Sequence, residues 1–141
     1  MTTSPTHDPD TPTDADATFV VGGGAAGRDV ADRLAARGDA VTHVDRTALP
    51  DPPPGHVTHT VDSFDVHSLR AAGLAEAGTV VVLTGDDACN LMVAQHARSA
   101  FDADRVVVAV NDPDRRPLFD ALDVETVDAA AAVGRTVTEL W

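Results

Sequence analysis

Short apolar runs alternate along the chain with longer stretches in which apolar residues recur at helical spacing. The runs indicate strands, and the most continuous of them, rich in Val, suit strands covered on both faces. The predicted strands are Thr18–Val21, Ala40–Val44, Val57–Val61, Thr79–Leu83, Arg105–Val110 and Val124–Val127. The predicted helices are Ala26–Arg37, Val66–Ala72, Asp87–Phe101, Pro113–Leu122 and Ala129–Leu140. This alternation predicts an α/β fold with a doubly wound parallel sheet of about six strands, in the expected order 3-2-1-4-5-6.

Residues at the ends of the helical stretches support these limits. Gly38 suits the C-terminus of the first helix, and Asp86 or Asp87 suits the N-cap of the third. Pro113 suits the first turn of the fourth. The connection after the second strand is different, because the three consecutive prolines within Asp51–Gly55 cannot continue a helix. We therefore expect an extended loop there.

A glycine-rich segment joins the first strand to the first helix: Gly22-Gly23-Gly24-Ala25-Ala26-Gly27. This is the G-x-G-x-x-G pattern of a Rossmann-like dinucleotide site, and Asp45 ends the second strand 18 residues after Gly27. In such a site Gly22 permits the tight turn, Gly24 lets the backbone approach a pyrophosphate, and Gly27 lets the helix pack closely on the strand. The helix N-terminus then faces the phosphates, and the Asp45 carboxylate accepts hydrogen bonds from a ribose. The pattern predicts nucleotide binding.

The charge balance narrows the classes of partner. The 141 residues carry 23 acidic side chains against ten Arg and no Lys, which gives a formal net charge of −13. No basic stripe is available for phosphate contacts, so we expect no nucleic-acid binding. The balance resembles that of acidic proteins from extreme halophiles, in which molar salt screens the self-repulsion. An ordinary acidic protein is the alternative.

Composition also bears on location and domain organisation. The apolar runs are too short to cross a bilayer and no signal peptide is evident, so we expect a cytoplasmic protein without direct membrane insertion. Residues 1–17 predict a disordered acidic tail, and residues 18–141 predict a single domain. The lone Cys89 favours a half-buried structural residue over a reactive one. The six His residues show no metal-ligand spacing, so we expect no metal site.

Four segments of the second half occur in a specific order. They are Val61-Asp62-Ser63-Phe64-Asp65, Leu74-Ala75-Glu76-Ala77-Gly78, Leu83-Thr84-Gly85-Asp86-Asp87-Ala88-Cys89-Asn90-Leu91 and Val110-Asn111-Asp112-Pro113. With the glycine segment and Asp45, they resemble the RCK/KTN family of TrkA-N type, the nucleotide-binding regulatory domains of Trk-type potassium uptake systems and ligand-gated potassium channels. The resemblance covers about residues 18 to 128. It implies a domain that binds NAD(H) or an adenine nucleotide (ATP or ADP), forms dimers and assembles as rings beneath a membrane pore.

The resemblance also implies a set of binding residues. The phosphate loop would comprise Gly22, Gly23, Gly24, Ala25, Ala26 and Gly27. Asp45 would hold the adenosine ribose, and Arg46 would lie along the adenine. Asp62 and Ser63 match a family segment beside the adenine. Thr84 and Gly85 end the fourth strand at the crevice where an open sheet binds ligands.

Some of these residues also have a purely structural interpretation. Asp62 suits a helix cap, Thr84-Gly85 suits a turn, and Asp86-Asp87 suits a solvated helix start. Asn111 and Asp112 are expected to shape the turn before Pro113 rather than to contact ligand.

Several positions depart from the family pattern. Members often carry Arg inside the glycine loop and again before Val-Asn-Asp-Pro, where this chain has Ala25 and Ala109, and Val61 stands in place of a Gly. Losing two cations beside a pyrophosphate removes charge-assisted hydrogen bonds of about 1.5–3 kcal/mol each, so weak binding is expected. The chain also ends at Trp141, without the C-terminal subdomain of many members or a fused pore. We therefore expect it to regulate a separate polypeptide.

These observations predict a non-enzymatic regulatory subunit that binds NAD(H), or ATP or ADP in its place, and controls a potassium transporter or another transporter. A small NAD-dependent oxidoreductase is one alternative, although no residues remain for a substrate domain. A dimerisation module that no longer binds nucleotide is the other. The apolar stripe of Val133, Val137 and Leu140 predicts a homodimer or a higher ring, unless the last helix folds back on its own sheet and Trp141 covers the edge.

Overall fold

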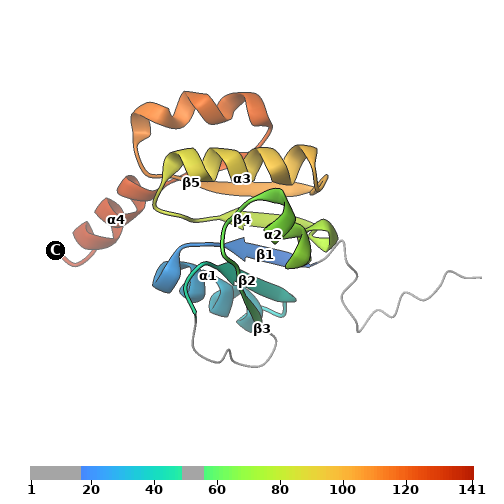
Figure 1. Ribbon diagram of the computed structural model, residues 1–141. Helices are drawn as coiled ribbons and strands as arrows, with labels where there is room; N and C mark the ends of the chain where they lie inside the picture. Colours follow the sequence, from blue (N-terminus) through green and yellow to red (C-terminus); the bar gives the residue numbers. More distant parts are fainter. Residues whose placement is uncertain (1–16, 49–55) are drawn as a thin grey trace, which may run out of the picture.

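The computed structural model describes residues 17–48 and 56–141. Its centre is a six-stranded parallel sheet in the order β3-β2-β1-β4-β5-β6, which confirms the predicted Rossmann-like α/β class and strand order (Figure 1). The strands are β1 (Thr18–Val21), β2 (Val41–Asp45), β3 (His56–Thr60), β4 (Thr79–Val82), β5 (Arg105–Val110) and β6 (Glu125–Asp128). The central strands are Val-rich because β-branched side chains pack well on a pleated surface. The order reverses between β1 and β4, which places a ligand crevice at their carboxyl ends.

Within residues 17–48 and 56–141, four α-helices and two 3₁₀-helices connect or follow the strands. They are α1 (Gly24–Ala36), α2 (Val66–Ala71), η2 (Leu74–Glu76), α3 (Asp87–Ser99), η3 (Pro113–Leu122) and α4 (Ala129–Thr138). The start predicted for α1 at Ala26 was two residues late, because Gly23 is the N-cap and Gly24 is already helical. Gly38 follows the helix with φ 97°, as the C-terminal signal predicted.

The helix predicted over 113–122 is a 3₁₀-helix, η3. Pro113 lies in its first turn, and the Asp112 side chain accepts a hydrogen bond from the Asp114 N–H at 3.0 Å. Pro117 lies inside the segment. Its missing N–H and its ring oppose the α-helical hydrogen-bond pattern, so the chain keeps the tighter turn.

Two clusters of buried side chains lie on opposite faces of the sheet. On one face, alternate strand residues such as Val21 and Val80 pack with Leu69 of α2 and Val93 of α3. On the other face, the smaller cluster consists of Val20, Val41 and Val81 with Ala31 of α1. α1 covers only part of this second face, and Val127 on β6 remains 41% exposed.

The last helix stands away from the rest of the domain (Figure 1). None of the residues of α4 is buried, and Trp141 beyond it is 97% exposed. The alternative in which this helix folds back on its own sheet and Trp141 covers the edge is therefore wrong. The larger apolar side chains of α4, those of Val133 and Val137, are exposed in the part of the chain that the structure describes.

Two sequence predictions fall outside the described residues. They are the acidic tail over residues 1–17, of which only Ala17 is described, and the extended loop at Asp51–Gly55. Among the residues that are described, no helix combines the length and hydropathy needed to cross a bilayer.

Candidate functional site

The glycine loop makes a tight turn between β1 and α1, and the backbone φ angles of Gly22, Gly23 and Gly24 are all positive. A Cβ atom at Gly22 would lie 2.5 Å from the Thr84 side chain, so the loop closely approaches the end of β4. A Cβ atom at Gly24 would meet nothing within 4 Å. The outer side of the loop is therefore open at Gly24, where a pyrophosphate would approach the backbone.

Gly27 lies in the first turn of α1, where the helix passes closest to the strands. A Cβ atom there would overlap the carbonyl oxygen of Gly22 and would lie 2.7 Å from Nε2 of His43. The third glycine of the pattern is thus required by close packing between helix and sheet, as the sequence predicted.

The N-terminus of α1 has no side-chain cap, because its N-cap residue is Gly23. The N–H groups of Ala26 and Gly27 bond back to the carbonyl of Gly23 at 3.0 and 3.2 Å. Ala25 and Ala26 are exposed and carry no polar group at the mouth of the loop. The positive end of the helix dipole therefore faces the crevice, although no cationic side chain of the loop accompanies it.

Asp45 ends β2 beside this helix terminus and is only 6% exposed. Its Oδ2 accepts a hydrogen bond from the Gly24 N–H at 2.9 Å, and its Oδ1 accepts one from the Arg46 N–H at 2.7 Å. The sequence placed Asp45 and the loop in one site, and the structure brings them into direct contact. A carboxylate oxygen has more than one lone pair, so Asp45 retains capacity for a ribose hydroxyl.

The segment after β3 lies next to the end of β2. The Arg46 side chain donates from Nε to the carbonyl oxygen of Asp62 at 3.2 Å. The exposed Asp62 side chain lines a hollow of about 250 Å³, which lies between β3 and α2 rather than over the glycine loop. Asp62 is not the helix cap, because Asp65 caps α2 by accepting from the Ser68 N–H at 2.7 Å.

Ser63 is engaged with the cap rather than with the loop. Its hydroxyl donates to Oδ2 of Asp65 at 2.8 Å. In the structure, Arg46 therefore contacts Asp62, whereas Ser63 bonds Asp65, the N-cap residue of α2.

A polar network closes the end of β4. Oδ1 of Asn90, a fully buried residue, accepts from the backbone N–H and from the hydroxyl of Thr84. The Asn90 amide donates to the carbonyls of Thr84 at 2.9 Å and Ala109 at 3.0 Å. Thr84 is thus held by protein groups, and the next residue, Gly85, is exposed. This part of the crevice offers a ligand mainly the exposed backbone at Gly85.

Asp87 makes a second connection, from α3 to the segment after β5. Burial opposes its ionisation, but the N–H groups of Asn111 and Asp112 outweigh this and hold the pKa of Asp87 below its ordinary value. Asp86 caps α3 by accepting from the Ala88 N–H at 2.9 Å. Asn111 and Asp112 shape the turn before Pro113, as expected. Asp87 is not a solvated residue at a helix start, because its buried carboxylate bonds the backbone of this turn.

Cys89 follows in the first turn of α3 and is partly buried against the larger core cluster. Burial raises the pKa of its thiol. This keeps the thiol protonated, as the structural role predicted.

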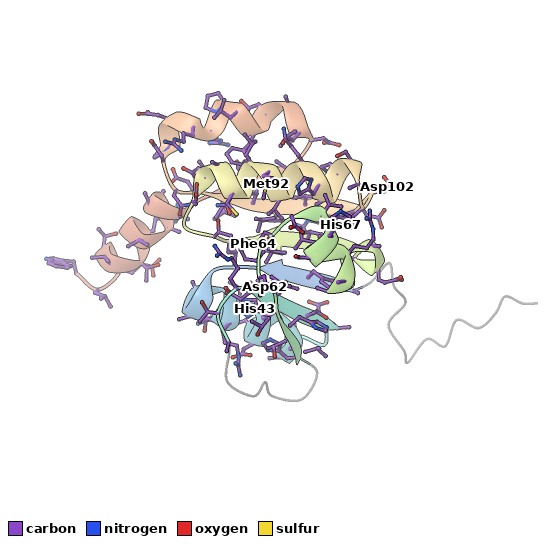
Figure 2. All side chains as sticks on the ribbon, in the orientation of Figure 1. His43, Asp62, Phe64, His67, Met92 and Asp102 are labelled. Carbon is purple, nitrogen blue, oxygen red and sulfur yellow. The ribbon has the colours of Figure 1, made fainter. Side chains whose placement is uncertain are left out.

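His43 is a site residue to which the sequence analysis gave no role. It is fully buried in β2, and its Nε2 lies 2.9 Å from the carbonyl oxygen of Gly22 and 3.5 Å from Oδ2 of Asp45 (Figure 2). An imidazole therefore lies directly beneath the phosphate loop and beside the candidate ribose carboxylate. The available signal was a polar His within a buried strand, two residues before Asp45.

Comparisons with known proteins agree with this geometry. The model of the TrkA-N domain family matches residues 18–129. The chain is 34% identical over 128 residues to the Trk system potassium uptake protein TrkA of Mycobacterium tuberculosis, covering 86% of this chain and 56% of that protein. It is 30% identical to the Trk system potassium uptake protein TrkA of Streptomyces coelicolor over 116 residues, covering 77% and 50%. The chain thus spans about half the length of these relatives.

The fold is also similar to that of solved structures of GsuK. The structure of GsuK bound to ADP superposes with a TM-score of 0.74 at 25% identity, covering 89% of this chain and 33% of that one. The GsuK channel bound to NAD gives the same TM-score and identity, covering 88% and 22%.

Proposed function

Because this chain belongs to the TrkA-N domain family, we propose that it is a regulatory subunit that binds NAD(H), with ADP or ATP as the alternative. It controls a potassium transporter, or another ion or solute transporter. The observation that carries the proposal is the hydrogen bond between the Asp45 carboxylate and the Gly24 N–H at the start of α1, whose N-cap residue, Gly23, has no side chain. This contact joins a ribose acceptor to a phosphate-binding helix terminus.

The arrangement favours an adenine nucleotide. Gly24 leaves open space for a pyrophosphate, and the three backbone N–H groups that bond Asp45, from Gly24, Arg46 and Thr47, orient its carboxylate. Arg46, which reaches from the end of β2 to Asp62, lies along the adenine side of the site. The ADP and NAD complexes of GsuK support these two ligands as the first to test.

We propose no catalytic role. Hydride transfer requires an acid or base positioned at the nicotinamide. The polar groups at the end of β4 are instead committed to one another, since Thr84 bonds Asn90, and Asp87 bonds the backbone after β5. These groups hold the crevice in shape, which is what a ligand-sensing domain requires.

The subunit acts as a homodimer, or as a larger ring built from dimers, and lies in the cytoplasm against its transporter. Val133 and Val137 of α4 are 64% and 46% exposed, and Leu140, which follows the helix, is 82% exposed. A hollow of about 700 Å³ lies between α1 and the sheet face that α1 leaves open. Val30, Val81 and Val107 supply part of its apolar lining. An exposed apolar helix and a hollow with an apolar floor and a polar rim that includes Arg37, Asp39 and Arg105 suit a two-fold exchange, in which each α4 enters the hollow of the other subunit.

Calorimetry with NADH, NAD⁺, ADP, ATP and NADPH in molar KCl tests the binding proposal. We expect saturable binding of at least one adenine nucleotide to the whole chain, and its loss in Gly24→Val, because a branched side chain would occupy the phosphate approach. Gly134→Val, in the exposed α4, is the matched control and should bind normally. If none of the five nucleotides binds, the result would favour the alternative of a dimerisation module that no longer binds nucleotide. Steady consumption of NADH with a cellular extract as substrate source, lost in Gly24→Val, would instead indicate the oxidoreductase.

A further inference from the structure

Four titratable side chains form a row beneath the glycine loop. Asp45 and His43 belong to β2, His56 belongs to β3, and Asp32 belongs to α1. The ring centroids of the two histidines are 6.3 Å apart, and Nδ1 of His56 lies 2.7 Å from Oδ1 of Asp32. Both imidazoles are buried, His43 completely and His56 to within 4%. The row therefore runs from the candidate ribose carboxylate through the interior to α1.

The hydrogen bonds define which ring nitrogens carry protons. The Gly22 carbonyl can only accept, so Nε2 of His43 carries the hydrogen. Asp32 accepts as a carboxylate, so Nδ1 of His56 carries the hydrogen. Two buried nitrogens then remain as acceptors without a hydrogen-bond partner in the described part of the chain: Nδ1 of His43 and Nε2 of His56. Orphaned polar atoms of this kind are rare in folded interiors and call for an explanation.

The charged side chains around His43 and His56 carry a net negative charge in the described part of the chain. From α1 come Asp32 and Arg28, which bond each other at 3.1 Å, and from β2 comes Asp45. From β3 comes His56, and β1 brings no titratable side chain. Burial opposes ionisation of Asp32, but hydrogen bonds from His56 and Arg28 hold its pKa below the ordinary value. With neutral imidazoles, Asp32, Asp45 and Arg28 sum to one negative charge among the described residues around the pair, which one added proton would balance.

We propose that nucleotide binding at the glycine loop is coupled to uptake of one proton by the His43–His56 pair. This inference rests on the proposed function. An added proton would occupy the free lone pair of one of the two orphaned nitrogens. It also places a positive charge next to the loop, where Ala25 and Ala109 provide none. His43 acts as a positioning residue, because it touches the Gly22 carbonyl and Asp45 rather than the ligand.

Linkage determines the size of the effect. If binding takes up one full proton, affinity measured between about pH 8 and 6 rises by up to about tenfold for each unit of pH decrease. By reciprocity, bound nucleotide raises the proton affinity of the pair by the same factor.

The test is calorimetric titration of the whole chain with NAD⁺, whose pyrophosphate diester does not titrate over this range. Titrations in two buffers of different ionisation enthalpy give the number of protons taken up. The wild type should approach one proton per NAD⁺. His43→Gln, which keeps an N–H donor for Gly22 but takes up no proton, should bind NAD⁺ with no uptake and a flat pH profile. His67→Gln, on the exposed side of α2, is the matched control and should behave as the wild type.

Two results overturn the coupling while the proposed function stands. One is NAD⁺ binding by the wild type without proton uptake, and the other is full uptake by the His43→Gln variant. Absence of NAD⁺ binding at every pH removes the nucleotide site and the coupling together. If His43→Gln does not fold, imidazole ¹⁵N spectra of the wild type decide the matter. NAD⁺ must then move the signals of the pair from neutral to doubly protonated, and unchanged signals overturn the proposal.

Discussion

Asp87 holds Asn111 in place across the end of the sheet. Its carboxylate accepts hydrogen bonds from the Asn111 backbone at 2.7 Å and from the Asn111 side chain at 3.1 Å, and it also accepts from the Asp112 N–H at 2.9 Å. The segments 83–91 and 110–113, two of the four that resemble the RCK/KTN family, are therefore joined to each other. These hydrogen bonds hold the carboxyl ends of β4 and β5 together at the crevice.

The first prediction is that Asp87→Asn destabilises the domain by about 1–3 kcal/mol, because hydrogen bonds to a charged group are lost. The pKa of Asp87 is lowered in the folded state, so its contribution is present above the ordinary value of 3.8 and is lost as pH falls below it. Denaturant unfolding between neutral pH and about pH 2 should show a smaller acid dependence in the variant. Asp86→Asn is the control, since Asn is as good an N-cap as Asp. Equal stabilities of Asp87→Asn and wild type would contradict this role.

The second prediction concerns close packing at Gly27. Gly27→Ala should lower stability by about 1–3 kcal/mol, because its Cβ would overlap the Gly22 carbonyl and crowd His43. Gly134→Ala makes the same chemical change in α4, where a Cβ meets nothing within 4 Å, and should be neutral or stabilising by up to about 1 kcal/mol. Thermal melts of both variants check this. A Gly27→Ala protein as stable as the wild type would mean that the loop can shift away from the helix.

The sequence was sufficient for the sheet but not for its cross-connections. Val-rich runs and the glycine pattern identify local structure, because strand and turn preferences act over a few neighbouring residues. The pairing of Asp87 with Asn111 spans 24 residues, and that of His43 with Gly22 spans 21, so both depend on which strands become neighbours. The 3₁₀ form of η3 was readable in principle from Pro117, whereas η2 is too short to leave a periodic signal.

The third prediction is a preference for NAD(H) or ADP over NADPH. The Asp45 carboxylate pairs with a free ribose 2′-hydroxyl and repels a 2′-phosphate. Asp45→Asn should reduce the discrimination by about tenfold or more, on the scale of one charge-assisted hydrogen bond. Direct titration with NADH and NADPH measures it. Arg46→Gln is the companion variant, because Arg46 is the nearby cation that would otherwise turn toward a phosphate. Equal or tighter NADPH binding by the wild type would refute the assignment of Asp45.

The fourth prediction is that the domain loses stability as KCl is diluted from molar to about 0.1 M, where the Debye length grows to about 10 Å. The excess acidic side chains, which give a formal net charge of −13, then repel one another with less screening. Melting temperatures across the series test this, and NaCl should act like KCl if screening is the cause. Sucrose at matched osmolality is the control, since it leaves charge repulsion unscreened. A melting temperature that does not change with salt would remove the halophile interpretation.

The last prediction is that α4 holds a homodimer together. The last helix ends at Thr138 rather than at the predicted Leu140. Val137 on α4 is 46% exposed and Leu140 beyond its end is 82% exposed, so in a monomer this apolar stripe faces water. Val137→Asp combined with Leu140→Asp should give a folded monomer in molar KCl, because charges on the stripe cannot be buried without a partner. Light scattering gives the mass and circular dichroism confirms the fold. Thr138→Asp, which adds the same charge beside the stripe, should leave the dimer intact. A wild-type protein that is already monomeric at micromolar concentration would show that the exposed stripe serves another partner, and the ring built from dimers would fall with it.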